Sequence, residues 1–249
     1  MMAVTHAFPA ARKQTYAFLE DARQTAHVYL MTEVDATRLV AARRAHNASY
    51  VSFVVKAAGD VLMDYPDARG VLSDGLTPRL TTLQAIHAKV LFDKTVDGQR
   101  CVLSGTVENV ELRSLEDVQA VIDEHKQAAV DGQGPFKQVR MLQRLPLWLV
   151  RMVYRGVLRN PIRRARLQGT FSVTSVGQES VRAIFPLIGG SLGFGVGRIA
   201  DAAIVREGRV EVAPTLTLSL AFDHRVLDGA MASELLARVK NRLENWELP

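Results

Sequence analysis

The hydrophobic pattern changes sharply near the end of the chain. Leu and Phe alternate with small and polar residues from 215 to 222, as in a strand with one buried face. Apolar residues then recur at helical spacing between Ala230 and Trp246, namely Leu235, Leu236, Val239 and Leu243. The sequence therefore predicts a strand and an amphipathic helix, joined by the short segment 223–229.

The same two patterns predict elements along most of the chain. We expect helices over residues 10–23, 49–64 and 114–130, and a further helix that Asp35 caps. We expect strands over 26–34, 87–92, 100–107, 169–177 and 188–199, and hairpins over 71–80 and 204–212. Residues 131–135 are expected to form a loop that acts as a hinge between elements.

Residues 137–166 carry nine Arg or Lys side chains and no acidic one. The whole chain has a net charge of +5, so the remainder carries −4 and the basicity is local. We expect a helix here with an apolar face opposite a basic one; its apolar residues are Leu145, Trp148, Leu149, Met152 and Val153, and its basic residues are Arg144, Arg151, Arg155 and Arg159. Packing on the core with a solvated basic face would explain this pattern.

The basic segment leaves three binding partners open: an acidic carrier protein, an anionic membrane surface, and the phosphates of a coenzyme. Nucleic acid is not expected, because no recognised nucleic-acid-binding module surrounds the Arg residues.

Composition indicates an ordinary globular protein, with 48% hydrophobic and 23% charged residues among 249. Cys101 is the only cysteine and cannot form an internal disulfide, which favours a reducing compartment. Residues 1–25 lack the apolar core of a signal peptide, and no uncharged apolar run reaches the ~20 residues that a membrane-spanning helix needs. We therefore expect a cytoplasmic location.

His224 is placed where a strand ends and a helix is about to begin. An imidazole titrates near neutrality, so at this position it could take a proton from a thiol or hydroxyl and later return it. Asp228 could fix the turn, cap the helix or pair with a cation, and Gly229 would let the chain bend. Taken alone, a single histidine is more often a surface residue than a catalytic one.

The longer string carries more information. His-x-x-x-Asp-Gly after an apolar strand resembles the active-site motif of the chloramphenicol acetyltransferase-like superfamily, and Asp-His-Arg-x-x-Asp-Gly-Ala at 223–230 is similar to the catalytic domain of dihydrolipoyl acyltransferases of 2-oxoacid dehydrogenase complexes. The strand, cap and helix from His27 to Leu39 resemble the opening of that domain. This resemblance implies a single α/β domain over residues 1–249, a two-layer sandwich in which helices cover a mixed β-sheet.

A second chemical segment is Gly-Thr-Phe-Ser-Val-Thr-Ser-Val-Gly at 169–177, similar to a family strand in which a serine hydroxyl stabilises the tetrahedral oxyanion. That serine corresponds to Thr174, which keeps the hydroxyl and adds a methyl group. Ser175 is the weaker candidate, because neighbouring residues of a strand point to opposite faces. The resemblance also places a basic residue that pairs with Asp228 at Arg12, or at Lys13 if the register shifts by one.

The resemblance implies an acyltransferase that moves an acyl group between a thioester of coenzyme A, or of a pantetheine or lipoyl carrier protein, and an acceptor. His224 would be the general base, Asp228 would support it, and Thr174 would donate to the oxyanion. It further implies a homotrimer, or multiples of trimers, in which His224 of one subunit meets Thr174 of the next. We expect no metal ion and no bound lipoyl group.

The sequence also departs from the family. It contains no recognisable lipoyl domain, peripheral subunit-binding domain or Ala/Pro linker, so we expect a stand-alone form that uses coenzyme A, an acyl carrier protein or a separate lipoyl protein. Residues 98–103 replace a family Gly-Leu-x-x-Pro-Val segment that helps build the acyl channel, so the substrate cannot be inferred. A non-catalytic trimeric scaffold that docks an acidic partner through the basic helix is the alternative. A condensation-type enzyme is less consistent with the length, since such chains carry two domains of this kind.

Overall fold

The computed structural model describes residues 3–131 and 133–248. Its α-helices are α1 (Lys13–Ala22), α2 (Thr37–His46), α3 (Tyr50–Leu62), α4 (Leu115–Gln127), α5 (Lys137–Arg144), α6 (Leu147–Leu158), α7 (Pro161–Gln168) and α8 (Gly229–Glu244). Its strands are β1 (His27–Asp35), β2 (Gly70–Ser73), β3 (Arg79–Thr82), β4 (Ala88–Val96), β5 (Gln99–Val107), β6 (Phe171–Ser175), β7 (Leu192–Val196), β8 (Ala200–Arg206) and β9 (Arg209–Asp223). Short 3₁₀ turns η1 (Ala10–Arg12), η2 (Asp67–Arg69), η3 (Val110–Leu112) and η4 (Gly134–Phe136) complete the set.

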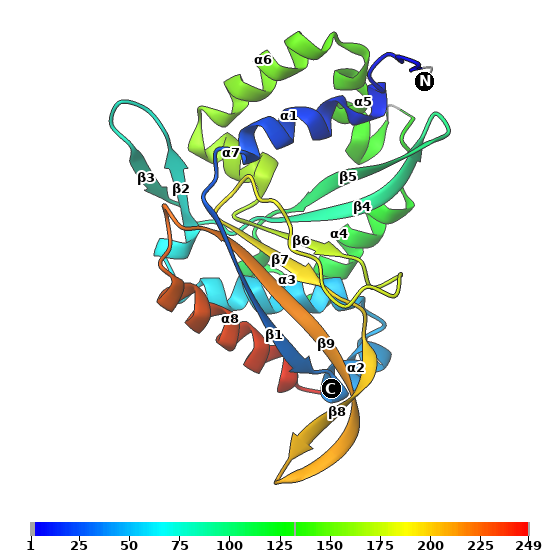
Figure 1. The fold of residues 1–249 in the computed structure, drawn as a ribbon, viewed down its shortest axis with the longest axis vertical. Helices are drawn as coiled ribbons and strands as arrows, with labels where there is room; N and C mark the ends of the chain where they lie inside the picture. Colours follow the sequence, from blue (N-terminus) through cyan, green and yellow to red (C-terminus); the bar gives the residue numbers. More distant parts are fainter. Residues whose placement is uncertain (1–2, 132, 249) are drawn as a thin grey trace.

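One mixed sheet organises the chain, with strand order β1-β9-β7-β6-β4-β5 and β8 paired to β9 outside this path. The β4–β6 and β6–β7 pairs are parallel and the others antiparallel. Strands from before residue 131 and from after residue 135 join this sheet, while β2 and β3 form a separate hairpin. The hinge expected over 131–135 includes residue 132, which lies outside the described residues, and Gly134–Phe136 forms the 3₁₀ turn η4. The α/β architecture and the mixed sheet expected from the sequence are confirmed (Figure 1).

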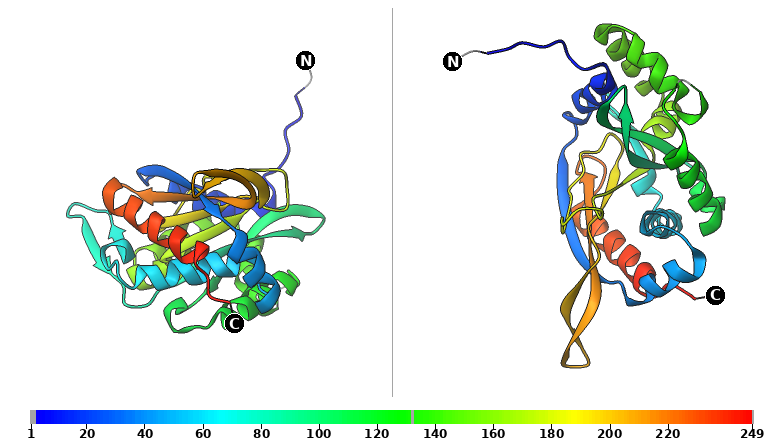
Figure 2. Two further views of the ribbon diagram at one scale, coloured as in Figure 1. Left: turned by 90° about the horizontal axis from the view of Figure 1, so that it is seen from below. Right: turned by 90° about the vertical axis from the view of Figure 1, so that its right-hand side faces the viewer.

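Helices α3, α4 and α8 cover one face of the sheet (Figure 2). The core lies between them, where Phe53 of α3 and Leu235 of α8 are fully buried together with Val173, Phe194 and Leu220 from three adjacent strands. Ser114 caps α4 by accepting from the Asp117 amide, and the Asp117 side chain accepts from the Ser114 amide in return. Asp35 accepts from the Thr37 amide as predicted, although the residue at the cap position itself is Ala36.

At one corner, the opposite face is covered by α1 together with α5, α6 and α7. There the Lys89 ammonium of β4 lies 4.5 Å from the ring centre of Phe18 of α1. Helix α6 packs on α1 through Val150, Tyr154 and Leu158. The predicted apolar face of this segment was only partly right: Leu145 packs against this cluster, but Trp148, Met152 and Val153 are exposed, because most of the residues that meet α1 lie on another side of α6.

The segment 181–188 crosses the same face of the sheet further along, over β7. The Ser219 hydroxyl of β9 donates to the Ile184 carbonyl at 2.5 Å. A Cβ on Gly195 would lie 2.0 Å from that carbonyl oxygen, and one on Gly197 would lie 1.9 Å from the Arg182 carbonyl oxygen. Gly195 and Gly197 thus allow a close approach, and the backbone that approaches is the chain's own.

None of the helices within residues 3–131 and 133–248 combines the length and the apolar character needed to cross a membrane.

Candidate active site

The turn that carries His224 lies between β9 and α8, as the sequence predicted. The His224 amide donates to the Ala26 carbonyl at 2.9 Å, and the Val226 and Leu227 amides donate to the Asp223 carbonyl. Leu227 is buried in the main core. The backbone of the turn is therefore tied to the start of β1 and to the end of β9.

Asp223 is the residue that fixes this turn, and the sequence analysis did not assign it a role. Its carboxylate is 3% exposed and accepts from the Arg225 amide and from the Arg225 guanidinium at 2.8 to 3.2 Å. Arg225 also reaches Asp74 in the loop between β2 and β3, at 2.7 Å. The hydrogen bonds to Asp223, and to a lesser degree the charge of Asp74, raise the pKa of Arg225, so its guanidinium stays charged. The sequence did contain a signal for the Asp223–Arg225 ion pair, because Asp-His-Arg places an acidic and a basic residue on either side of His224.

The side chain of His224 is exposed and accepts no hydrogen bond from the residues that the structure describes. Its ring tilts against Phe222, with centroids 5.5 Å apart. A rigid backbone and a free imidazole are what a general base needs, because the ring must exchange protons with a bound substrate.

Asp228 and Gly229 do less within the chain than the sequence suggested. Asp228 occupies the N-cap position of α8, but its carboxylate makes no capping hydrogen bond and is exposed. Gly229 has no left-handed backbone angle, and a Cβ there would meet nothing within 4 Å. The backbone at Gly229 therefore makes no use of the freedom of glycine, and the Asp228 carboxylate has no partner among the residues described.

The predicted pairing of Asp228 with Arg12 is not formed in the described chain. Arg12 precedes α1, whose other end leads into β1 and the His224 turn, so about 15 Å of helix separates them. Lys13, the alternative register, instead donates to the Gln143 and Leu145 carbonyls at 3.0 and 2.7 Å and binds the end of α5.

Thr174 lies near the end of β6, partly buried, and its hydroxyl has no partner among the residues described. Ser175 is exposed, and its hydroxyl accepts from the Gly177 amide at 3.2 Å. Of the two candidates, Thr174 is thus the one whose hydroxyl is free to donate.

Thr174 and His224 lie far apart within one chain. Thr174 pairs with Gly195, which pairs with Ser219, four residues before Asp223. Four residues at about 3.4 Å each and two strand spacings of about 4.8 Å put Asp223 roughly 17 Å from Thr174. His224 lies further along the same strand direction. The two side chains of one chain therefore cannot contact the same carbonyl group.

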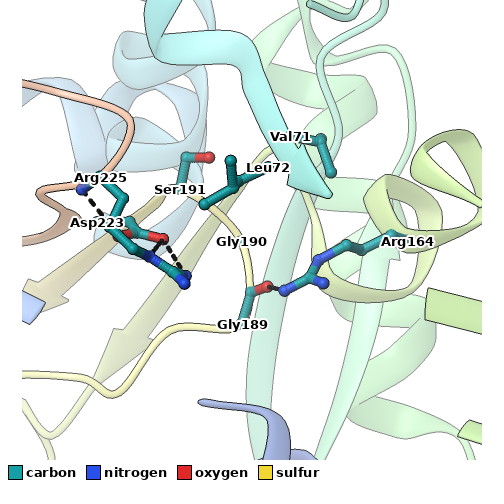
Figure 3. A pocket seen from close by; sticks show the side chains of 8 residues that line it. All are labelled: Val71, Leu72, Arg164, Gly189, Gly190, Ser191, Asp223 and Arg225. Carbon is teal, nitrogen blue, oxygen red and sulfur yellow. Dashed lines mark hydrogen bonds and ion pairs between the residues drawn. The ribbon is translucent and has the colours of Figure 1, made fainter. Parts of the chain in front are cut away.

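A polar cluster behind the turn was missed by sequence reasoning. The Lys89 ammonium donates to Gln168 at 2.9 Å, and Arg164 pairs with Asp21 at 3.2 Å and donates to the Gly189 carbonyl. Burial lowers the pKa of Lys89 to about 8, although the nearby Asp21 carboxylate acts to raise it. Burial also raises the pKa of Asp21, although the positive charges of Arg164, Arg225 and Lys89 act to lower it. The hollow between Arg164 and Arg225 measures only about 10 Å³, so it has room for about one water molecule (Figure 3).

The face of the sheet beyond residues 181–188 carries exposed apolar side chains. Tyr29 and Met31 of β1 and Phe185 line a shallow hollow of about 570 Å³, and Leu187 beside them is 48% exposed. Such a patch on a protein surface commonly marks a contact with another molecule.

Arg151, Arg155 and Arg159 were predicted to bind a partner or phosphate. Arg151 is already paired with Glu20 of α1 at 2.6 Å. Arg155 and Arg159 are exposed and form no ion pair with any described acid. Only the latter two remain available to an outside molecule.

Residues 4–140 and 160–249 match the family of 2-oxoacid dehydrogenases acyltransferase (catalytic domain). The chain belongs to this family. The match omits residues 141–159, which comprise the end of α5 and all of α6. The resemblance that the sequence analysis drew from residues 223–230 and 169–177 is thereby confirmed.

Curated relatives include the dihydrolipoyllysine-residue acetyltransferase component of the pyruvate dehydrogenase complex of Bacillus subtilis, 27% identical over 95% of this chain and 49% of that protein. The component of the same name from Staphylococcus epidermidis is 24% identical over 98% of this chain and 52% of that protein. The chain thus spans about half the length of the curated relatives it matches.

Solved structures share the fold. A probable dihydrolipoamide acetyltransferase of Listeria monocytogenes has a TM-score of 0.72 with 19% identity and 99% coverage of both chains. The dihydrolipoamide acetyltransferase of Azotobacter vinelandii has a TM-score of 0.71 with 17% identity, covering 98% of this chain and 92% of that one. The fold expected from the sequence is therefore that of these acyltransferase cores.

Proposed function

We propose that this chain is an acyltransferase that moves an acyl group between a thioester and an acceptor, with His224 as the general base. Membership of the acyltransferase family supports this proposal. The observation that carries it is the combination at the turn: Asp223 and Arg225 hold the backbone rigidly, while the His224 imidazole is exposed and unpartnered among the described residues.

The proposed reaction is a direct transfer. His224 takes the proton from the thiol or hydroxyl of the acceptor, whose sulfur or oxygen attacks the thioester carbonyl carbon. The tetrahedral intermediate then collapses, the bond from carbon to the leaving sulfur breaks, and protonated His224 returns its proton to the departing thiolate. Thr174 donates a hydrogen bond to the oxyanion, a contact whose removal costs ~3–4 kcal/mol where a single donor of this kind has been tested.

We propose that two copies of the chain share each active site, in a homotrimer or a multiple of trimers. The separation of about 17 Å within one chain supports this arrangement, because His224 and Thr174 can then act together only if they come from different copies. The exposed apolar patch around Tyr29, Met31 and Phe185 supports it too, since self-association would cover that patch.

Asp228 corresponds in position to an asparagine of the Azotobacter enzyme. The catalytic mechanism of that enzyme has been investigated through a serine, a histidine and an asparagine four positions after the histidine. His224 and Asp228 have the same spacing here, with a carboxylate in place of the amide. An ionised carboxylate only accepts hydrogen bonds, so we propose that Asp228 pairs with a cationic group brought by another copy or by the substrate.

The proposed donors are thioesters of coenzyme A, of a pantetheine carrier protein or of a lipoyl group on a separate protein, and the proposed mechanism uses neither a metal ion nor a lipoyl group on this chain. The relatives named above are acetyltransferases that act on a dihydrolipoyllysine residue, which makes dihydrolipoamide the first acceptor to test.

The test is to incubate the protein with acetyl-, propionyl- and longer acyl-coenzyme A, with and without dihydrolipoamide. Products should be separated by chromatography, because transfer from one thiol to another leaves the total free thiol unchanged. We expect coenzyme A and S-acyl-dihydrolipoamide to form together, and His224→Ala to lower the rate at least about a hundredfold.

His46→Ala is the matched control, because His46 pairs with Glu116 on the outside of α2 and α4 and should leave the rate unchanged. If His224→Ala retains full activity, the assignment of the base is wrong. If no donor reacts, including an acylated carrier protein, the non-catalytic scaffold is the better explanation.

A further inference from the structure

Helix α6 presents a stripe of side chains to solvent that neither the fold nor the proposed chemistry uses. Trp148, Met152, Arg155 and Arg159 follow one another at intervals of four, three and four residues, and so lie along one side of the helix. Trp148 is 65% exposed and Met152 is 58% exposed. Figure 1 shows α6 at the outer margin of the molecule, beyond α1, and Figure 2 shows the same.

The neighbouring helices extend this stripe. Met141 of α5 is 60% exposed and Ile162 of α7 is 57% exposed, and each lies near an exposed arginine, Arg144 and Arg163 respectively. We call these eight residues the arginine face: Met141, Arg144, Trp148, Met152, Arg155, Arg159, Ile162 and Arg163. Each of these three consecutive helices therefore exposes a bulky apolar side chain and at least one guanidinium group.

The charges of this face are not neutralised by the chain itself. Three other arginines of the segment are paired internally: Arg140 with Asp97, Arg151 with Glu20 and Arg164 with Asp21. In the described structure the four arginines of the arginine face have no acidic partner, and residues 137–166 contain no acid at all. The excess positive charge is therefore directed outward.

The arginine face is held firmly from behind. Val150, Tyr154 and Leu158 are buried against α1, and Gln168 binds the Tyr154 hydroxyl. The family match omits 141–159, so this helix is not part of what the family shares. A well-packed helix that exposes Trp and Met to water, outside the shared catalytic domain, indicates a purpose other than catalysis.

We propose that the arginine face binds the surface of a lipid bilayer that contains anionic headgroups. Trp and Met fit the boundary between headgroups and acyl chains, where an indole gains from its amphipathic character. Arginine side chains beside them can reach phosphate groups while their methylene stems stay in the apolar boundary. The four unpaired positive charges complement the negative surface of such a membrane, and the exposed Trp148 and Met152 beside them favour a bilayer over an acidic protein or a free phosphate.

Vesicle co-sedimentation tests the proposal on the intact chain. We expect binding to vesicles of phosphatidylcholine with about 30% phosphatidylglycerol, and little binding to phosphatidylcholine alone. Each basic residue near an anionic surface strengthens binding roughly fivefold, so the double variant Arg155→Glu with Arg159→Glu should bind at least about tenfold more weakly. Raising the salt concentration should also weaken binding, because the Debye length shortens.

The matched control is Arg38→Glu with Arg44→Glu, which makes the same charge change on exposed, unpaired positions of α2. This control should bind vesicles as the wild type does if the arginine face is the site. Equal loss in both double variants would show a general charge effect and overturn the proposal.

Tryptophan fluorescence gives a second readout. The chain has two tryptophans, and Trp246 is only 8% exposed, with its ring 4.7 Å from that of Phe53. A blue shift of the emission on adding anionic vesicles should therefore come from Trp148, and it should vanish in Trp148→Phe. An unchanged spectrum, or retention of an acidic carrier protein by this face in place of vesicles, would overturn the proposal. Neither experiment depends on acyl transfer, so failure here leaves the proposed enzymatic function untouched.

Discussion

Thr174 lies level with Ser219 of β9 across two strand pairings, and His224 follows Ser219 by five residues, so in one chain the hydroxyl and the imidazole are separated both across two strands and along the strand direction. This geometry makes a sharp prediction about mixed assemblies. His224→Ala and Thr174→Val should each be nearly inactive alone. Subunits mixed one to one by refolding or co-expression should recover about a quarter of the wild-type activity, because about one interface in four combines an intact His224 with an intact Thr174.

The control for mixing is two preparations of His224→Ala with different tags, which should stay inactive at every ratio. Recovery close to zero in the true mixture would place both residues in one chain and refute the shared site.

Replacement of Thr174 separates the hydroxyl from the methyl group. Thr174→Ser keeps the donor and should retain most of the activity, whereas Thr174→Val keeps the shape and should lower kcat by about 10²–10³-fold. Ser175→Ala is the matched control, since that hydroxyl accepts from the Gly177 amide and should matter little to the rate. Equal rates for Thr174→Val and the wild type would remove Thr174 from the mechanism.

The two carboxylates on Arg225 should differ greatly in importance. Asp223 is 3% exposed and accepts several charge-assisted hydrogen bonds, so Asp223→Asn should lower the free energy of unfolding by about 1–3 kcal/mol. Asp74 is exposed, and Asp74→Asn should cost less than about 1 kcal/mol. Urea denaturation of both variants checks this order, and a larger loss for Asp74→Asn would contradict it.

The approach of residues 182–184 to β7 depends on glycine. Gly195→Ala would put a Cβ 2.0 Å from the Ile184 carbonyl oxygen, so unfolding should become easier by about 1–3 kcal/mol or more as the segment is displaced. Gly229→Ala provides the comparison, because its Cβ would meet no atom and alanine favours helices by about 1 kcal/mol over glycine. Thermal denaturation should therefore lower the Tm of the first variant and leave or raise that of the second.

Lys89 should make stability depend on alkaline pH. Its pKa is about 8 in the folded chain and 10.5 ordinarily, so between these values the unfolded state binds more protons than the folded state. The free energy of unfolding of the wild type, relative to Lys89→Met, should thus be flat below pH 8 and rise by up to about 1.4 kcal/mol for each pH unit up to about 10.5. Urea titrations at pH 7, 8, 9 and 10 measure this difference, and a constant value would exclude the effect.

Local patterns were sufficient for most of the fold. Alternation predicted β1 and the end of β9, and helical spacing predicted α3 and α8. The side of α6 that is buried was not predictable in the same way. It contains apolar residues on two sides, and the side that becomes buried is decided by α1, which is more than a hundred residues away.

The site was predictable where a motif spanned consecutive residues, as for His224, and less so where partners come from distant segments. Asp223 was noticed only as part of a string, because its burial and its link to Arg225 depend on packing. The Lys89, Asp21 and Arg164 cluster joins three elements that no short pattern connects. Arg12 and Asp228 form no ion pair in the described chain because α1 lies between them. Matching Arg12 to a family position by sequence alone gives no information about this distance.

The separate packing of α6 bears on how the protein could diverge over time. Val150, Tyr154 and Leu158 form their own small cluster with Ala17, detached from the main core that supports β9 and α8. Substitutions on the outer side of α6 are therefore nearly neutral for the geometry around His224. A lineage can change the location of such a protein, by altering one helix, while selection on its chemistry continues undisturbed.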